Sequence, residues 1–179
     1  MNICVFGAAS DNIAPTFIGE TEKLGEAIAK RGFGLVYGGG ATGLMGAVAR
    51  GIKAQKGYIH GVAPSYFDTP GILLKDIDKL TFTDTIRERK QIMEDDAAAF
   101  IMVPGGVGTY EEFFEILTLA NLDRHKKPIA VYNIAGYFDR MIDLIDFSVK
   151  EGFINKEIYG DFNVFTDTEE LLDYIQNNL

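Results

Sequence analysis

The feature that most constrains the fold of this sequence is a repeated alternation of short apolar runs with longer amphipathic segments. Short apolar runs between glycine, proline or polar residues are typical of buried strands, and apolar residues spaced three and four apart are typical of helices. The pattern predicts strands at Ile3–Phe6, Gly34–Tyr37, Tyr58–Ala63, Leu80–Thr83, Ala98–Val103, Ile129–Tyr132 and Asn163–Phe165. It predicts helices at Thr16–Lys30, Leu44–Lys56, Asp84–Asp96, Thr109–Leu122, Tyr137–Lys150 and Glu169–Asn177. Asp167 and Glu170 have the spacing of a capping box at the start of the last helix.

Buried strands that alternate with helices form a mostly parallel sheet with helices on both faces. We therefore expect one doubly wound α/β domain over residues 1–179, with an irregular loop at residues 64–79. The 20 glycines are many for 179 residues, and their clusters lie where predicted strands end. Because ligands of such sheets bind at the carboxyl ends of the strands, we expect the functional site at the glycine clusters.

The charge and the cysteine content exclude several classes of partner. The net charge is −9, since 17 Lys and Arg oppose 26 Asp and Glu, and such a field repels nucleic acid and anionic membranes. Cys4 has no second cysteine to pair with, and the two histidines offer no zinc-ligand spacing. The first residues show neither a signal peptide nor a membrane span. We expect a reduced cytoplasmic domain without metal, nucleic-acid partner or membrane partner.

The first glycine cluster, residues 38–46, contains a formal G-x-G-x-x-G pattern. A dinucleotide fingerprint would follow the first strand, and an acidic residue would end the next strand. Here the cluster follows the second predicted strand, and the next strand ends without an acid. It also lacks the Lys-Ser/Thr of a P-loop. We therefore favour a tight strand-to-helix turn that lines the site over a nicotinamide-dinucleotide site.

The second glycine cluster, residues 103–112, joins a predicted strand to a helix start. Exposed backbone N–H groups at such a start form a cradle for phosphate, although a purely structural turn would look the same. Thr109 and Glu112 have the spacing of a capping box, which gives Glu112 a structural role. Glu111 has no such structural role, so it either acts on the ligand or interacts favourably with the helix dipole. Glu115 and Thr118 lie on the same helical face as Glu111.

The third feature is Arg89 on a predicted helix, where Ile86, Ile92 and Met93 are its neighbours. A guanidinium within an apolar stripe needs a partner, because an unpaired buried charge is costly. The alternatives are an arginine that extends to solvent, an ordinary ion pair, or a forked donor for an anionic or nucleobase ligand. Lys90 stands at the edge of the same stripe.

Arg89-Lys90 followed by Pro-Gly-Gly-Val-Gly-Thr-Tyr-Glu at 104–111 resembles the LOG (Lonely Guy) family, whose hallmark is R-K and then P-G-G-x-G-T-x-x-E. Tyr-Gly-Gly-Gly-Ala-Thr-Gly-Leu-Met-Gly at 37–46 also resembles that family. Two departures are Phe6-Gly7-Ala8-Ala9-Ser10, where the family usually has C-G-S-S, and Ile86-Arg87, where it often has Met-His. The family comprises cytokinin riboside 5′-monophosphate phosphoribohydrolases, which are often labelled lysine decarboxylases.

The resemblance implies a Rossmann-like fold, a homodimer and cofactor-free hydrolysis of the N-glycosidic bond of an adenine-type nucleoside 5′-monophosphate. It implies that Arg89 and Glu111 are catalytic. The residues that it implies bind substrate are Arg89, Lys90, Gly105, Gly106, Val107, Gly108, Thr109, Glu111 and Thr118. Because glycosidic cleavage builds positive charge on the ribose, a carboxylate beside a phosphate cradle suits this chemistry.

Two other functions remain open on the sequence. One is a carrier or sensor that binds a nucleotide without cleaving it, and the other is an NAD-dependent redox enzyme. A carrier has no use for a carboxylate in the first turn of the helix, and the missing ribose-binding acid disfavours the redox enzyme. A pyridoxal-phosphate decarboxylase is disfavoured because no phosphate cup with a Schiff-base lysine is recognisable.

Overall fold

The computed structural model describes residues 1–155 and 161–179. Its strands are β1 (Asn2–Phe6), β2 (Gly34–Tyr37), β3 (Ile59–Pro64), β4 (Lys79–Thr83), β5 (Ala97–Met102), β6 (Ile129–Tyr132) and β7 (Asn163–Phe165). Its α-helices are α1 (Pro15–Lys30), α2 (Gly43–Ala54), α3 (Ile86–Asp96), α4 (Val107–Asn121), α5 (Asp139–Lys150) and α6 (Thr168–Asn177). Two short 3-10 helices, η1 (Ser65–Phe67) and η2 (Ile134–Gly136), follow β3 and β6.

The strands form one seven-stranded sheet in the order β4-β3-β2-β1-β5-β6-β7, and each pair of neighbours is parallel. The central strand β1 pairs with β2 on one side (Ile3 with Leu35) and with β5 on the other (Cys4 with Phe100). The strand order therefore reverses between β1 and β5, where Rossmann-like folds bind their ligands. The prediction of a doubly wound, parallel α/β fold is confirmed.

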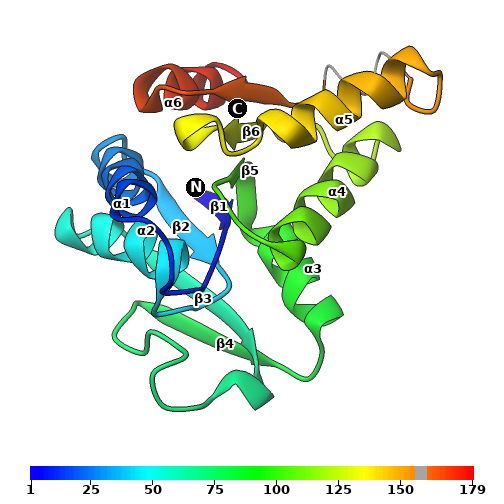
Figure 1. Ribbon diagram of the computed structural model, residues 1–179. Helices are drawn as coiled ribbons and strands as arrows, with labels where there is room; N and C mark the ends of the chain where they lie inside the picture. The colour runs from blue at the N-terminus through cyan, green and yellow to red at the C-terminus, as the bar shows by residue number, and fades with distance from the viewer. Residues whose placement is uncertain (156–160) are drawn as a thin grey trace.

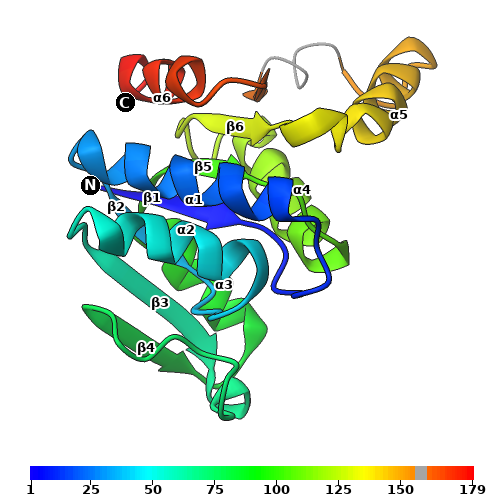
Figure 2. The same ribbon diagram turned by 60° about the vertical axis from the view of Figure 1, so that its left-hand side comes forward.

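The two faces of the sheet bury separate apolar clusters. Side chains of α1, α2 and α6 pack on one face, and those of α3, α4 and α5 pack on the other. Figures 1 and 2 show this layering, with α1 and α2 on one side of the strands and α3 and α4 on the opposite side. Near-complete burial explains why most strands are continuously apolar rather than alternating.

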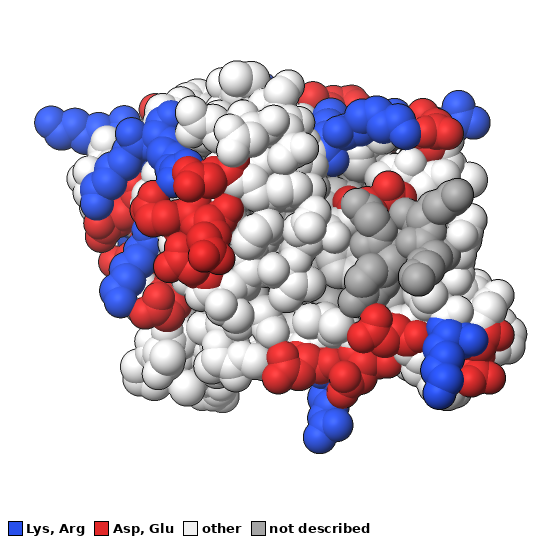
Figure 3. Space-filling model, turned by 90° about the horizontal axis from the view of Figure 1, so that it is seen from above, with Lys and Arg blue, Asp and Glu red and all other residues white. Residues whose placement is uncertain are grey.

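Ion pairs connect the helices at the surface. Arg31, after the end of α1, contacts Glu169 at 2.5 Å and Asp173 at 2.6 Å on α6. On the face that carries α5 and α6, acidic and basic side chains lie around the edges, and a largely uncharged area lies between them (Figure 3). Among the described residues no helix combines the length and apolar character needed to cross a bilayer.

Helix α3, which carries Arg89, is fixed at both ends. Thr85 and Glu88 form a complete capping box at its start. At its end, Asp96 lies 2.7 Å from Nδ1 of the buried His60 on β3, and Nε2 of His60 lies 2.9 Å from the Thr81 hydroxyl on β4. This histidine is a satisfied core residue that ties α3 to the sheet.

The start of α4 differs from the sequence prediction. The helix begins at Val107 rather than Thr109, because Gly106 occupies the N-cap position with an extended conformation. Thr109 is thus the third helical residue, and its side chain lies against Gly105. The predicted capping box of Thr109 and Glu112 was therefore wrong. At α6 the Asp167 side chain does cap the helix, accepting from the N–H groups of Glu169 and Glu170.

Smaller differences concern α5 and the long loop. Helix α5 begins at Asp139, because the Asn133 side chain holds the preceding turn by accepting from the Phe138 N–H at 2.7 Å. The irregular segment after β3 is predicted correctly as a loop, with one turn of 3-10 helix. Its residues Ile72–Leu74 hydrogen-bond to the backbone of Gly39 and Ala41, which fixes the segment beside the first glycine cluster.

Candidate active site

Three loops meet at the carboxyl ends of the central strands. They are residues 7–14 after β1, the glycine triplet after β2 and the Pro-Gly-Gly turn after β5. The Ala8 N–H donates to the Pro104 carbonyl at 3.1 Å, and the Ala8 carbonyl accepts from Leu44 N–H at 2.8 Å. The loop after β1 therefore connects the two glycine clusters of the sequence, as the strand order requires.

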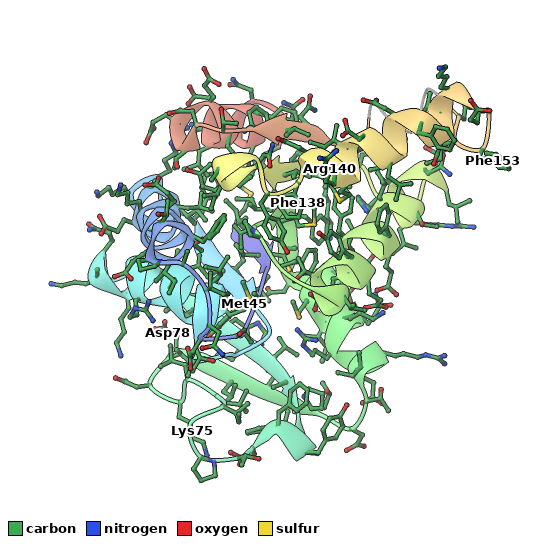
Figure 4. The ribbon with its side chains drawn as sticks, viewed as in Figure 1. Met45, Lys75, Asp78, Phe138, Arg140 and Phe153 are labelled. Carbon is green, nitrogen blue, oxygen red and sulfur yellow. The ribbon has the colours of Figure 1, made fainter. Side chains whose placement is uncertain are left out.

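A cavity of about 190 Å³ lies between the loop after β1 and the glycine triplet after β2. Gly38, Gly40 and Met45 contribute to one side, and the Phe67–Leu73 part of the long loop contributes apolar side chains. Figure 4 shows Met45 in the middle of the molecule, at the start of helix α2. Arg89 and Glu112 bring opposite charges to the same cavity. It is the place where a small polar ligand could meet both groups.

Arg89 and Glu112 form a buried ion pair. Nη2 of Arg89 lies 2.8 Å from Oε1 of Glu112, and the two side chains are only 15% and 10% exposed. Oε1 is shielded from solvent, and the contact lacks hydrogen-bond geometry. Nε of Arg89 donates instead to the Val62 carbonyl of β3 at 3.2 Å. The guanidinium is therefore anchored to the sheet while it faces the carboxylate of α4.

Burial raises the pKa of Glu112, because removal from water disfavours its charged form. The Arg89 guanidinium opposes this shift, and the neighbouring carboxylate of Glu111 adds to it. The balance leaves Glu112 with a raised pKa in spite of its cationic partner. A carboxyl group with a raised pKa keeps its proton at higher pH than an exposed one, and perturbed pKa values of this kind are common among catalytic acids and bases.

Lys90 and Glu111 form a different pair. Lys90 Nζ contacts Glu111 Oε1 closely and lies 2.7 Å from Oε2 of Glu115. The Glu111 side chain is 52% exposed, whereas Glu112 is enclosed. Of the predicted catalytic pair, the structure thus brings Arg89 to the cavity and pairs Glu111 with Lys90. The residue that contacts Arg89 is Glu112, for which the sequence predicted a role in helix capping.

A signal for Glu112 was present in the sequence. In the pattern P-G-G-x-G-T-x-x-E, the final acid stands three residues after the threonine, and three residues after Thr109 is Glu112. The same spacing fits a capping box, which is why the sequence alone favours Glu111 for the ligand. The apolar wall from the 64–79 loop had no such signal, because its contact with the glycine triplet depends on tertiary pairing.

The second glycine cluster forms an open turn at the start of α4. A Cβ added at Gly105 would lie 2.1 Å from Thr109 Oγ1, so packing requires that glycine. A Cβ added at Gly106 or Gly108 would meet nothing within 4 Å. The first N–H groups of a helix have no partner within it and are free to bind an anion. Bare backbone beside these groups leaves room for a phosphate at residues 106–109.

The cradle borders a hollow of about 290 Å³ that includes Ser10, Phe17, Gly106 and Tyr137. The Tyr137 hydroxyl donates to the Gly105 carbonyl at 2.8 Å and thereby fixes the turn. No sequence pattern singled out Tyr137, which was expected inside a helix. It lies instead on the tight turn before α5, where Ala135 has a φ of 52°.

Thr118 lies away from the cradle. It is about 16 Å along α4 from Val107, given the rise of an α-helix. Its hydroxyl donates to the Phe114 carbonyl, and the residue lines an apolar pocket of about 170 Å³ with Ile145 of α5. Within one chain the structure therefore does not bring Thr118 to the other predicted site residues. In the described ranges, no group of three or more His, Cys, Asp and Glu side chains is arranged to hold a metal ion.

These features define a Rossmann-like protein with a buried Arg–Glu pair beside an open glycine turn. The family model described as "Possible lysine decarboxylase" matches residues 45–175. Among curated proteins, the cytokinin riboside 5′-monophosphate phosphoribohydrolase of Mycobacterium tuberculosis is 40% identical over 153 residues, covering 86% of this chain and 81% of that protein. The LOG7 enzyme of Arabidopsis thaliana is 37% identical, covering 86% and 70%. The chain belongs to the LOG family.

A further curated relative agrees with this assignment, and a solved structure shares the fold. The rice protein LOGL5, named a probable enzyme of the same type, is 35% identical, and the match covers 86% of this chain but 62% of that protein. Among solved structures, a molybdenum cofactor binding protein of Rippkaea orientalis matches with a TM-score of 0.74 at 19% identity, covering 98% of this chain and 96% of that chain. At such identity the similarity concerns the fold alone.

The buried ion pair predicts a specific pH dependence of stability. Because the pKa of Glu112 is raised on folding, the folded state binds more protons than the unfolded state at pH values between the ordinary value of 4.5 and the folded value. The free energy of unfolding of the wild type, compared with that of Glu112→Gln, should therefore fall as the pH rises through this window. The fall is about 1.4 kcal/mol for each pH unit that separates the unfolded and folded pKa values of Glu112.

Urea unfolding of both proteins at several pH values measures this difference. Glu115→Gln is the control, because it changes a half-exposed carboxyl of α4 that is not among the groups that shift the pKa of Glu112. A stability difference that rises with pH would show that Arg89 outweighs burial and lowers the pKa of Glu112.

Proposed function

We propose that this chain hydrolyses the N-glycosidic bond of adenine-type nucleoside 5′-monophosphates, cytokinin riboside monophosphates or AMP, to the free base and ribose 5-phosphate. The observation that carries the proposal is the buried ion pair of Arg89 and Glu112, which lines a cavity at the carboxyl edge of the sheet. The curated LOG-family relatives, whose names specify cytokinin riboside 5′-monophosphates, support it.

The proposed chemistry follows from the charges. As the bond from ribose C1′ to the base nitrogen breaks, its electron pair leaves with the base and positive charge develops on the ribose. The Glu112 carboxylate stabilises that charge and takes a proton from the water that attacks C1′. The departing base takes up one proton, which balances the proton that the water gives to Glu112, and Arg89 donates a hydrogen bond to the base or anchors the substrate. The open turn at Gly106–Thr109 holds the 5′-phosphate.

The glycine cradle and Glu112 share one helix. Glu112 is five residues from Val107, so a phosphate at the helix start and a ribose beside the second turn are about 7 Å apart along the axis. This separation is compatible with the distance between the 5′-phosphate and the C1′ atom of one nucleotide. The alternative function is a carrier or sensor that holds the same nucleotide without cleaving it, and such a protein would gain nothing from a buried carboxylate with a raised pKa.

Base release from AMP, N6-isopentenyl-AMP and adenosine, measured side by side without added cofactor, tests the proposal. We expect free base from one or both monophosphates. Adenosine should be a substrate at least about a hundredfold poorer than AMP. It has no 5′-phosphate and so loses about two charge-assisted hydrogen bonds to the backbone N–H groups. Equal turnover of adenosine and AMP would contradict the phosphate cradle. Tight binding of the nucleotides with no base released would favour the carrier.

Substitution of the adjacent carboxylates tests the roles within the site. Glu112→Gln should lower turnover about a hundredfold to a thousandfold, because the amide keeps the shape but removes the charge that the ribosyl cation needs. Glu111→Gln and Glu115→Gln lie on the same helix as Glu112 but remove charges that pair with Lys90 of α3, so they should retain most activity. Turnover of AMP beside thermal unfolding measures all three. The reverse result would assign catalysis to the Lys90–Glu111 pair.

We also propose a homodimer formed through α4 and α5. Large apolar side chains are exposed there, with Leu144 at 60%, Phe147 at 59% and Leu122 at 58%. Thr118 lies on the same surface, so an interface there would give it a route to the partner's site that one chain does not provide. Docking such a surface removes apolar area from water.

Sedimentation velocity at micromolar concentration checks the dimer. We expect a dimer for the wild type and a monomer for Leu144→Asp with Phe147→Asp, since two buried carboxylates in an apolar interface are unfavourable. Arg140→Asp, a change to acid at a fully exposed position on the same helix, should leave the dimer intact. A monomeric wild type would contradict the proposal.

A further inference from the structure

The glycine triplet after β2 contains a close contact that neither a dinucleotide fingerprint nor a simple turn explains. A Cβ added at Gly38 would lie 2.3 Å from Nη2 of Arg89, 3.2 Å from Cζ and 3.5 Å from Nε. The first distance is far below any real contact between these atoms, so a side chain at position 38 and the guanidinium cannot occupy their present places together. Gly38 and Arg89 line the same cavity as Glu112.

The three glycines of the triplet have different surroundings. Gly39 has a φ of 76°, a backbone conformation that favours glycine. Gly40 faces Met45, where an added Cβ would lie 3.3 Å from the Met45 Cβ. Gly38 is outside the set of residues with positive φ. Its backbone would accept an L-residue, and the conflict at this position is with Arg89 alone among the three nearest atoms.

The guanidinium has little freedom to move aside. Its Nε donates to the Val62 carbonyl, its Nη2 contacts Glu112, and the helix that carries it is fixed by the Thr85–Glu88 capping box. A displacement that makes room for a methyl group at position 38 must lengthen at least one of the first two contacts. Either change weakens the alignment of Arg89 with the carboxylate.

We propose that Gly38 is a positioning residue whose missing side chain provides the space in which the Arg89 guanidinium is held against Glu112. The glycine triplet then places a cation, instead of enclosing the phosphates of a dinucleotide. For its effect on turnover this inference rests on the proposed hydrolase function. For its effect on the ion pair it rests on the geometry alone.

The test is a double-mutant cycle of Gly38→Ala and Arg89→Ala, followed by urea unfolding. In the wild-type background Gly38→Ala should lower the unfolding midpoint, because it separates a buried ion pair. In the Arg89→Ala background it should leave the midpoint unchanged or raise it, because the methyl group enters the space that the guanidinium has left. The cost of leaving Glu112 without a partner is common to both Arg89 variants and cancels. Arg89→Met gives a second cycle with a longer side chain if Arg89→Ala does not fold.

Activity provides the second readout. A misplacement of about 1 Å commonly lowers turnover about a hundredfold, so Gly38→Ala should lower kcat by that order while the nucleotide KM changes little. The pH profile should shift as well, because Glu112 loses the cation that opposes its raised pKa. The control is Gly19→Ala on the exposed side of α1, where an added Cβ meets nothing within 4 Å and activity should be unchanged.

The outcomes separate this inference from the proposed function. Equal midpoint losses from Gly38→Ala with and without Arg89 would overturn the inference, because the residue would then act through the backbone. A wild-type kcat and pH profile in Gly38→Ala would overturn it too. Coupling in the unfolding cycle, together with a wild type that releases no base, would support the role of Gly38 and overturn the hydrolase.

Discussion

The structure depends on one costly interaction, the burial of an arginine and a glutamate against each other at the end of the central strands. Neither charge is stable alone in that position. Each is held by a separate part of the fold: Arg89 by the Val62 carbonyl and a capped helix, and Glu112 by a helix that begins directly at the Pro-Gly-Gly turn. The glycine turns, the packing of α3 and the start of α4 can all be understood as placing these two groups.

The fold could be predicted from the sequence because its signals are local and repeated. Continuous apolar runs such as Ala98–Val103 identify buried parallel strands, and the glycine clusters mark their carboxyl ends. Arg89 could be identified as well, since a guanidinium in an apolar helix stripe requires a partner. The identity of that partner could not be derived from spacing alone. Thr109 and Glu112 satisfy the capping-box pattern, but the extended Gly106 starts the helix two residues earlier and turns Glu112 inward.

Other features of the site depend on tertiary contacts that no local pattern records. The pairing of Ile72–Leu74 with the first glycine cluster brings an apolar wall to the cavity, and Tyr137 reaches the Gly105 carbonyl from a turn that was predicted as helix. The predicted substrate-binding role of Thr118 has no counterpart within one chain, because the residue faces the apolar surface between α4 and α5. A place for it in the site belongs to the assembly that we propose.

The most direct test of the central claim is a crystal structure of Glu112→Gln with AMP, because the substitution should slow cleavage enough to retain the nucleotide. We expect the phosphate at the backbone N–H groups of residues 107–109, and the ribose C1′ in the cavity beside the side chains of Arg89 and residue 112. A nucleotide bound elsewhere, or one whose glycosidic bond points away from this pair, would contradict the role that we assign to Arg89 and Glu112.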